Sequence, residues 1–234
     1  MALEPMSEIA SRLELSIQSQ ESSTQNQKCL EPHNCAICNG TGFIPSANSH
    51  GYIECQCAIE KRATTRLPER FRQASFLDIN ASIHNFVLDW FKAPGDGLFI
   101  SGKAGRGKTY LAAAIVRTLL FIHQEAFFIR CPDFYAALRE AYRTNTSDHS
   151  VYGQYVNPNY VVLDDLGSGT LSDFQRAATT ELLDQRINKQ QRPTIVTSNW
   201  SLEQIAEKLD ERIASRLSSF VSLELAGEDR RMRK

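Results

Sequence analysis

Short apolar runs alternate with longer, less uniform stretches along most of the chain. The runs predict strands, and they cover residues 97–101, 126–131, 160–164 and 193–198. The stretches around them predict helices, which cover residues 85–92, 108–124, 132–143 and 172–188. Strands that alternate with helices of this length indicate an α/β fold in which helices cover both faces of a parallel sheet. A ligand of such a sheet binds at the carboxyl ends of the strands.

The first thirty residues carry a different pattern. A single apolar stripe recurs at spacings of three and four, formed by Met6, Ile9, Leu13 and Ile17. A helix of about fifteen residues is too short to be stable alone. Residues 18–28 are rich in Gln, Ser, Thr and Asn, which predicts a flexible tether. The stripe therefore either folds back onto this protein or docks into a groove of a partner.

Composition narrows the class of protein. The chain has 234 residues, is 42% hydrophobic and carries a net charge of −1, so it can bury a full α/β core and is not disordered. No run approaches the roughly 18 apolar residues of a membrane helix, and no secretory signal begins the chain. We expect a soluble, cytoplasmic protein without a membrane partner. Near-neutral charge means that any basic surface for nucleic acid is local.

Five of the six cysteines lie within residues 29–57. A CxxC pair is followed after sixteen residues by a CxC pair, which is close to zinc-ribbon spacing. The expected zinc ligands are Cys35, Cys38, Cys55 and Cys57. Cys29 and His33 lie close enough in sequence to replace one of them. Disulfides are the less favoured alternative in a cytosolic protein.

Residues 102–109, Gly-Lys-Ala-Gly-Arg-Gly-Lys-Thr, match the GxxxxGK[ST] phosphate-binding loop between a strand and a helix. Its glycines let backbone N–H groups turn toward a triphosphate, and they are Gly102, Gly105 and Gly107. Lys108 supplies a positive charge to the β- and γ-phosphates, and Thr109 offers its hydroxyl to Mg²⁺. We also expect Arg106 and Tyr110 to contact the nucleotide, which would be ATP.

Two further strands end in polar side chains. Asp164 and Asp165 follow the apolar run Tyr160–Leu163, where Asp164 would hold Mg²⁺ and Asp165 would orient the attacking water. Many enzymes of this type carry Glu at the second position, so the shorter Asp leaves the rate of hydrolysis open. Asn199 follows the next strand and either senses the γ-phosphate or caps the following helix.

Two helical faces carry arginine. Arg212 and Arg216 stand four residues apart, on either a solvated face or one that presents a finger to a neighbouring subunit's nucleotide. The helix at 132–143 places aromatic and guanidinium groups on one face, formed by Tyr135, Arg139, Tyr142 and Arg143. Bases of single-stranded DNA could stack on that face, although such a face is also typical of a solvated amphipathic helix.

Taken together, these motifs resemble the DnaC/DnaI/IstB branch of AAA+ ATPases. The resemblance covers roughly residues 35–231 and is carried by segments 67–76, 102–109, 160–167, 197–199, 211–217 and 227–231. It implies an AAA+ core without a helical lid, because only a short strand at 220–225 and a basic tail follow Leu217. It also implies roles for three arginines: Arg216 as arginine finger, Arg212 as its box VII support and Arg231 as sensor II.

The resemblance implies an ATP-dependent loader that assembles as a homo-oligomer and places a DnaB-type replicative helicase on single-stranded DNA. Three parts would share the work: an N-terminal helix and tether at 1–28, a zinc-binding module that docks the partner at 29–62, and an AAA+ ATPase domain at 63–234. Two alternatives stay open. One is an accessory ATPase of transposition of the IstB type, and the other is a DNA-binding adaptor that uses nucleotide only as a switch.

Overall fold

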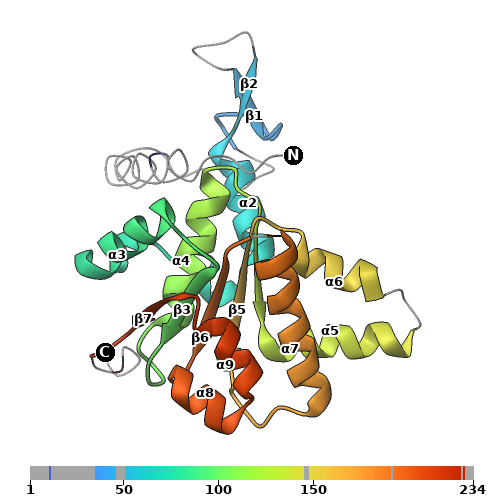
Figure 1. Cartoon of the computed structure of the whole chain (residues 1–234). Helices are drawn as coiled ribbons and strands as arrows, with labels where there is room; N and C mark the ends of the chain where they lie inside the picture. The colour runs from blue at the N-terminus through green and yellow to red at the C-terminus, as the bar shows by residue number, and fades with distance from the viewer. Residues whose placement is uncertain are drawn as a thin grey trace.

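A five-stranded parallel sheet forms the centre of the protein in a computed structural model (Figure 1). The structure describes residues 11, 35–45, 51–144, 148–190, 192–227 and 229. The strands of the sheet are β3 (Gly97–Ser101), β4 (Ala126–Arg130), β5 (Tyr160–Leu166), β6 (Thr194–Ser198) and β7 (Val221–Glu224). They lie in the order β4-β5-β6-β3-β7, and each neighbouring pair is parallel. The expected α/β fold with a parallel sheet is confirmed.

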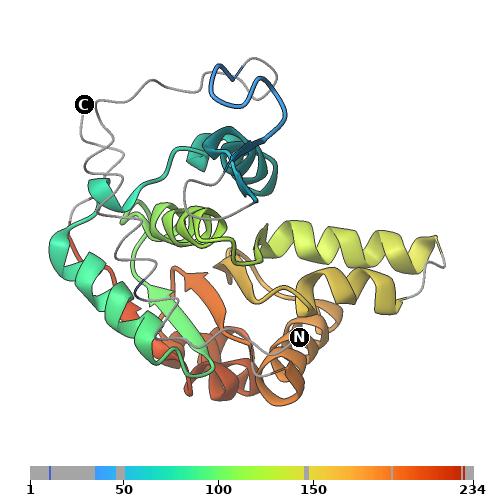
Figure 2. The same ribbon diagram turned by 90° about the horizontal axis from the view of Figure 1, so that it is seen from above.

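Helices cover both faces of this sheet (Figure 2). One face is covered by α2 (Gln56–Arg66), α3 (Ala81–Lys92) and α4 (Lys108–Phe121). The other is covered by α5 (Cys131–Arg143), α6 (Asp148–Val156), α7 (Asp173–Asp184), α8 (Leu202–Lys208) and α9 (Glu211–Leu217). Alternation along β3 explains the two cores, because Leu98 and Ile100 join the first and Phe99 joins the second.

Several predicted boundaries differ from those observed. The helix expected from residue 85 begins at Ala81, because the Asn80 side chain accepts a hydrogen bond from the Ser82 N–H (2.8 Å) and caps it. The helix expected to reach residue 188 ends as α7 at Asp184 and continues as a π-helix, η4 (Gln185–Gln190). Sequence reasoning missed α6, whose apolar residues form no clear stripe.

The buried residue Arg186 joins η4 to the sheet. Its side chain is fully buried and donates to the Thr194 hydroxyl at 2.7 Å. It also donates to the backbone carbonyls of Tyr155, Val156, Pro158, Asn159 and Pro193. Burial lowers the pKa of the Arg186 guanidinium, and this ring of oxygen acceptors offsets the loss of water. The Arg186 guanidinium thus connects the end of α6 to the start of β6 through hydrogen bonds.

The cysteine-rich segment is continuous with the core. A hairpin of β1 (Phe43–Pro45) and β2 (Tyr52–Glu54) projects from one end of the molecule (Figure 1). Directly after it, α2 begins next to Cys55 and packs Ala63 into the main core. The expected boundary between residues 62 and 63 therefore falls inside one helix. Two short 3-10 turns, η2 (Glu69–Phe71) and η3 (Phe76–Asp78), follow it in a lead-in segment before α3.

Some expectations fall on residues outside the described parts. They are the N-terminal helix and tether at 1–28, the substitute ligands Cys29 and His33, and the sensor arginine Arg231. Within the described ranges, no helix has both the length and the apolar character needed to cross a bilayer.

Candidate functional site

The phosphate-binding loop connects β3 to α4 at the carboxyl end of the sheet. Gly107 directly precedes α4 with a left-handed backbone (φ 91°), a conformation that glycine adopts without strain. A side chain at Gly102 would meet the Leu225 carbonyl oxygen, since a Cβ there would lie 2.5 Å from it. The loop therefore needs glycine at both positions for reasons internal to the fold.

The amine of Lys108 lies at the centre of this loop and is nearly buried. It donates to the carbonyls of Gly102 (2.6 Å) and Lys103 (2.9 Å), and to Oδ1 of Asn199 (2.8 Å). Asn199 therefore meets the loop, as the first of its two predicted roles requires. The capping alternative is wrong, because Ser201 caps α8 and forms a capping box with Gln204.

Asp164 lies beside the loop on β5 and is only 3% exposed. Its carboxylate accepts hydrogen bonds from the hydroxyls of Thr197 (2.7 Å) and Thr109 (3.3 Å). Burial raises the pKa of Asp164, while these two hydroxyls act in the opposite direction. The Thr109 hydroxyl and the Asp164 carboxylate are oxygen ligands of the kind that Mg²⁺ prefers, and their proximity fits a shared ion.

Thr197 is a site residue that sequence reasoning missed. It bonds to Asp164 and also accepts a hydrogen bond from the Asp165 N–H (2.9 Å). Its place follows from strand register, since β5 and β6 pair Leu163 with Val196 and so bring the next residues side by side. Its signal in the sequence was the strand ending 197–199, which also carries the family resemblance.

Asp165 has an unusual backbone. Its φ of 63° lies in the left-handed region, where β5 and β6 shift register between Leu163 and Leu166. Aspartate tolerates this conformation better than most residues. The bend brings Oδ1 of Asp165 to 3.3 Å from Nδ2 of Asn199, which donates to it. Asn199 thus connects Asp165 to Lys108 through its two amide atoms.

A cavity of about 600 Å³ runs along these residues. Its wall contains the site residues Lys108, Thr109, Asp164, Asp165 and Asn199. A second group of lining residues consists of Arg70, Phe71, Asp78 and Tyr110. Of this second group, the sequence predicted only Tyr110, because the other three lie in the lead-in segment more than twenty residues before the loop. Arg106 belongs to the loop but not to the cavity wall.

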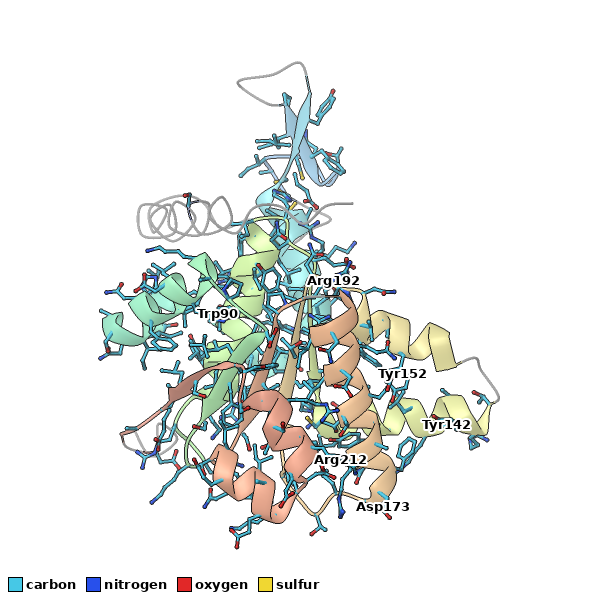
Figure 3. The ribbon with its side chains drawn as sticks, viewed as in Figure 1. Trp90, Tyr142, Tyr152, Asp173, Arg192 and Arg212 are labelled. Carbon is cyan, nitrogen blue, oxygen red and sulfur yellow. The ribbon has the colours of Figure 1, made fainter. Side chains whose placement is uncertain are left out.

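The two arginines of α9 bond to carboxylates of their own chain. Arg212 pairs with its helix cap Asp210 (3.1 Å), and its side chain is 70% exposed. Figure 3 shows it on α9 beside α7. Arg216 grips Asp184 at the end of α7 through Nε (2.6 Å) and an outer nitrogen (2.7 Å). Neither arginine lines the nucleotide cavity of its own chain.

The expected DNA-stacking face of α5 is partly wrong. Tyr135 is 3% exposed, and its hydroxyl bonds to the Thr179 hydroxyl on α7 (2.8 Å), so it cannot stack on a base. Its position turns inward because α6 and α7 both pack on α5 and widen its buried face. Tyr142, 54% exposed near the outer end of α5 (Figure 3), contacts Phe174.

The two arginines of that face, Arg139 and Arg143, make different contacts. The guanidinium of Arg139 lies 6.0 Å from the centre of the Phe174 ring. Arg143 forms a bidentate pair with Glu140, at 2.6 and 2.9 Å. The exposed part of the predicted face therefore consists of Arg139, Tyr142 and Arg143.

Four buried thiols form a second candidate site at the start of α2: Cys35, Cys38, Cys55 and Cys57. Their sulfur atoms all lie within 4.8 Å of one another, with two pairs at 3.4 and 3.7 Å. A tetrahedral zinc with Zn–S bonds near 2.3 Å separates its sulfurs by about 3.8 Å, whereas a disulfide needs about 2.0 Å. The cluster fits zinc, and the Gly42 N–H donates to Sγ of Cys38 (3.3 Å), which supports a thiolate there.

An ion pair and a histidine contact connect this thiol cluster to the helix of the phosphate loop and its end. Oε2 of Glu54, the residue before Cys55, lies 2.8 Å from an outer nitrogen of Arg62. It also lies 3.0 Å from Nδ1 of His123, which follows α4. Within α2, Glu60 pairs with Arg117 of α4 (2.6 Å). The segment that carries the thiol cluster is therefore held against α4 by side-chain contacts.

The phosphate loop, the acid pair on the adjacent strand and the five-stranded parallel sheet define a P-loop nucleotide-binding protein of the AAA+ class. Residues 68–218 match the family model described as IstB-like ATP binding protein, and the chain belongs to this family.

Curated relatives and a solved structure agree with this assignment. The chain is 30% identical over 118 residues to the replicative helicase loader DnaC of Escherichia coli (strain K12), covering 50% of this chain and 48% of that protein. It is 27% identical over 141 residues to the replicative helicase loader DnaI of Bacillus subtilis (strain 168), covering 58% and 45%. The chain thus spans about half the length of these relatives. A crystal structure of the DnaC helicase loader is 27% identical, with a TM-score of 0.58 over 68% of this chain and 100% of that one.

Proposed function

We propose that this protein hydrolyses ATP and uses the cycle to place a DnaB-type replicative helicase on single-stranded DNA. The observation that carries the proposal is the conjunction of a complete P-loop site with similarity to two proteins named replicative helicase loaders. The proposed setting is the cytoplasm, where such a helicase meets the chromosome or another replicon.

The residues of the cavity divide the chemistry among them. Lys108 and the loop N–H groups bind the phosphates, and Thr109 and Asp164 hold Mg²⁺, which supplies positive charge to the triphosphate. The Asp165 carboxylate accepts a hydrogen bond from an O–H of the attacking water. Asn199 positions both this carboxylate and Lys108. Because Asp165 sits on a bend of the strand, its carboxylate reaches toward Asn199 despite being shorter than Glu.

The proposed finger acts between subunits. Arg216 lies outside its own cavity and is held by Asp184 through one edge of the guanidinium. The other outer nitrogen donates to the Arg212 carbonyl (2.9 Å), and the remaining hydrogens of the two outer nitrogens can be presented to the γ-phosphate of a neighbour. Arg212 supports the same helix through its cap, and ATP would favour a homo-oligomer by completing this shared site.

The remaining surfaces are assigned to partners. The zinc-binding module and the N-terminal segment would hold the helicase, and the exposed part of the α5 face would contact single-stranded DNA. Several large apolar side chains of the module face solvent, which supports a docking role: Ile37, Phe43, Tyr52 and Ile53.

A pull-down with purified components tests the proposal. The full chain, with ATP or ADP, is mixed with a DnaB-type helicase in one arm and with an IstB-associated transposase in the other. Nucleotide-dependent capture of the helicase, lost in Lys108→Ala, is the expected result. Capture of the transposase alone would favour the transposition function, for which the family match is the specific observation. Capture of neither would refute both.

A further inference from the structure

The Arg117 side chain on α4 bonds to both α2 and the lead-in segment. One outer nitrogen donates to Oε1 of Glu60 on α2 (2.6 Å), and the other donates to the Ala74 carbonyl of the lead-in segment (3.4 Å). The guanidinium also lies 4.9 Å from the centre of the Phe121 ring. Because the Arg117 side chain is only 16% exposed, water screens these contacts less than it would screen those of a surface arginine.

The peptide unit between Ala74 and Ser75 is held by α4 through both of its polar groups. Its carbonyl accepts from Arg117, and its N–H donates to the Tyr110 hydroxyl (3.1 Å). Tyr110 in turn donates to Oδ2 of Asp78. Burial of Tyr110 and the Asp78 carboxylate raise the pKa of this hydroxyl, while the charge of Arg117 acts in the opposite direction, so the hydroxyl stays protonated. Two side chains of one helix thus fix the place of a single peptide unit.

This peptide unit lies between two parts of the lead-in segment that line the nucleotide cavity. Arg70 and Phe71 stand before it on η2, and Asp78 follows it on η3. The Ala74 N–H donates to the Phe71 carbonyl (3.0 Å), and the Ser75 side chain caps η3. A shift of the peptide unit would therefore move residues of the cavity wall on both sides of it.

The other bond of Arg117 leads toward the thiol cluster. Glu60 lies three residues after Cys57, on the helix whose first turn carries that thiol. This helix, α2, packs beside α4 (Figure 1). We propose that Arg117 is a positioning residue that couples the thiol cluster to the nucleotide cavity, through Glu60 on one side and the Ala74–Ser75 peptide on the other.

The proposal rests on the proposed function only in taking the cavity as an ATP site and the thiols as a zinc site. It needs no partner protein. When Glu60 no longer holds Arg117, the wall of the cavity must be ordered as the nucleotide binds, and this cost weakens binding. Coupling between two sites is reciprocal, so ATP should also strengthen the binding of zinc.

The ATP affinity of the full-length protein tests the coupling, by displacement of a fluorescent ATP analogue in excess Mg²⁺. Glu60 belongs neither to the thiol cluster nor to the cavity wall. Glu60→Ala should weaken ATP binding about fivefold or more while keeping its zinc, which elemental analysis checks. Glu54→Ala is the matched control, because Glu54 contacts Arg62 and His123 rather than Arg117, and its ATP affinity should be unchanged.

Removal of zinc separates coupling from a local loss of packing. A zinc-selective chelator should weaken ATP binding to the wild-type protein about fivefold or more, and it should have little effect on Arg117→Gln, whose ATP affinity is already lowered. In the reverse direction, ATP should raise the zinc affinity of the wild-type protein by the same factor, and this increase should be absent in Arg117→Gln. A purely structural role of Arg117 would lower stability without removing the dependence of one ligand on the other.

Unchanged ATP affinity in a folded, zinc-loaded Glu60→Ala protein would overturn the proposal. An equal effect of zinc removal on wild type and Arg117→Gln would also overturn it, because the effect would then reach the cavity by another route. If Arg117→Gln fails to fold, Glu60→Ala takes its place in the comparison, and if the protein carries no zinc, Glu60→Ala alone decides. A wild-type protein that binds no ATP would refute the proposed function and this coupling together, whereas failed helicase capture alone leaves the coupling intact.

Discussion

The amide of Asn199 bonds at once to the amine of Lys108 and to the carboxylate of Asp165, at 2.8 and 3.3 Å. A side chain at the end of β6 thus touches both the group that binds phosphate and the group proposed to orient water. ATP binding and ATP hydrolysis can therefore be tested separately, because Lys108 and Asp165 can be substituted independently.

Asn199→Ala and Asp165→Asn should retain ATP binding and lose hydrolysis, by about 10²-fold or more, because the water is oriented mainly in the transition state. Lys108→Ala should instead lose binding. Titration with a fluorescent ATP analogue and a phosphate-release assay measure the two quantities on the same samples. Tight ATP binding by Lys108→Ala would show that the loop is not the nucleotide site.

Asp164 should make the nucleotide-free protein less stable at neutral pH. Burial raises its folded pKa above the unfolded value, so the favourable contribution of this group to folding is present at low pH and is lost as pH rises through the folded pKa. Asp164→Asn should therefore raise the melting temperature at pH 7 while abolishing Mg²⁺-dependent turnover. The gain should shrink as the pH is lowered toward 4. A variant less stable than wild type at pH 7 would mean that the bonds from Thr197 and Thr109 outweigh the cost of burial.

The purified protein should contain about one zinc per chain, and Cys55→Ser should remove it. Because Glu54 and Glu60 connect the thiol cluster to α4, metal loss should lower the melting temperature of the ATPase core as well as unfold the hairpin. Elemental analysis and thermal melting, before and after chelation, check both points. Cys131→Ser is the control, since Cys131 is buried in the ATPase core and lies outside the cluster. Protein prepared under reducing conditions and free of zinc would refute the site.

Arg216→Ala should bind ATP normally but lose hydrolysis that depends on protein concentration or DNA. Adding Lys108→Ala subunits, which carry an intact Arg216, should restore part of the activity in trans if the finger serves a neighbour. Arg212→Ala is measured beside it, because both arginines pair with carboxylates of their own chain and the comparison shows which of them serves as the finger. Full activity of both variants would leave α9 as an ordinary solvated helix.

Residues close together in sequence were predicted well, whereas Thr197 and Asp78 were missed, because strand register and a long-range hydrogen bond bring them to the site. The loop from Gly102 to Thr109 and the acid pair carry their chemistry in local order, so the sequence placed them together. Thr197 joined Asp164 only through the register of β5 and β6. Asp78 reached the cavity because the Tyr110 hydroxyl holds a segment thirty-two residues away in sequence.

The error at Tyr135 has a similar origin. Helical spacing alone put it on the face of Arg139, but the width of a buried face depends on how many neighbours pack against the helix. With α6 and α7 both in contact with α5, the buried face extended to Tyr135.

The guanidinium of Arg186 gathers carbonyl oxygens from the end of α6 and the start of β6 around a single buried cation. To open α6 alone, the protein would have to leave that cation in its interior without the two carbonyl acceptors of Tyr155 and Val156. Local opening of this kind costs far more than the fraying of an ordinary short helix. In a hydrogen–deuterium exchange experiment, we therefore expect the amides of α6 to exchange together with those of the central strands, although α6 lies at the edge of the molecule.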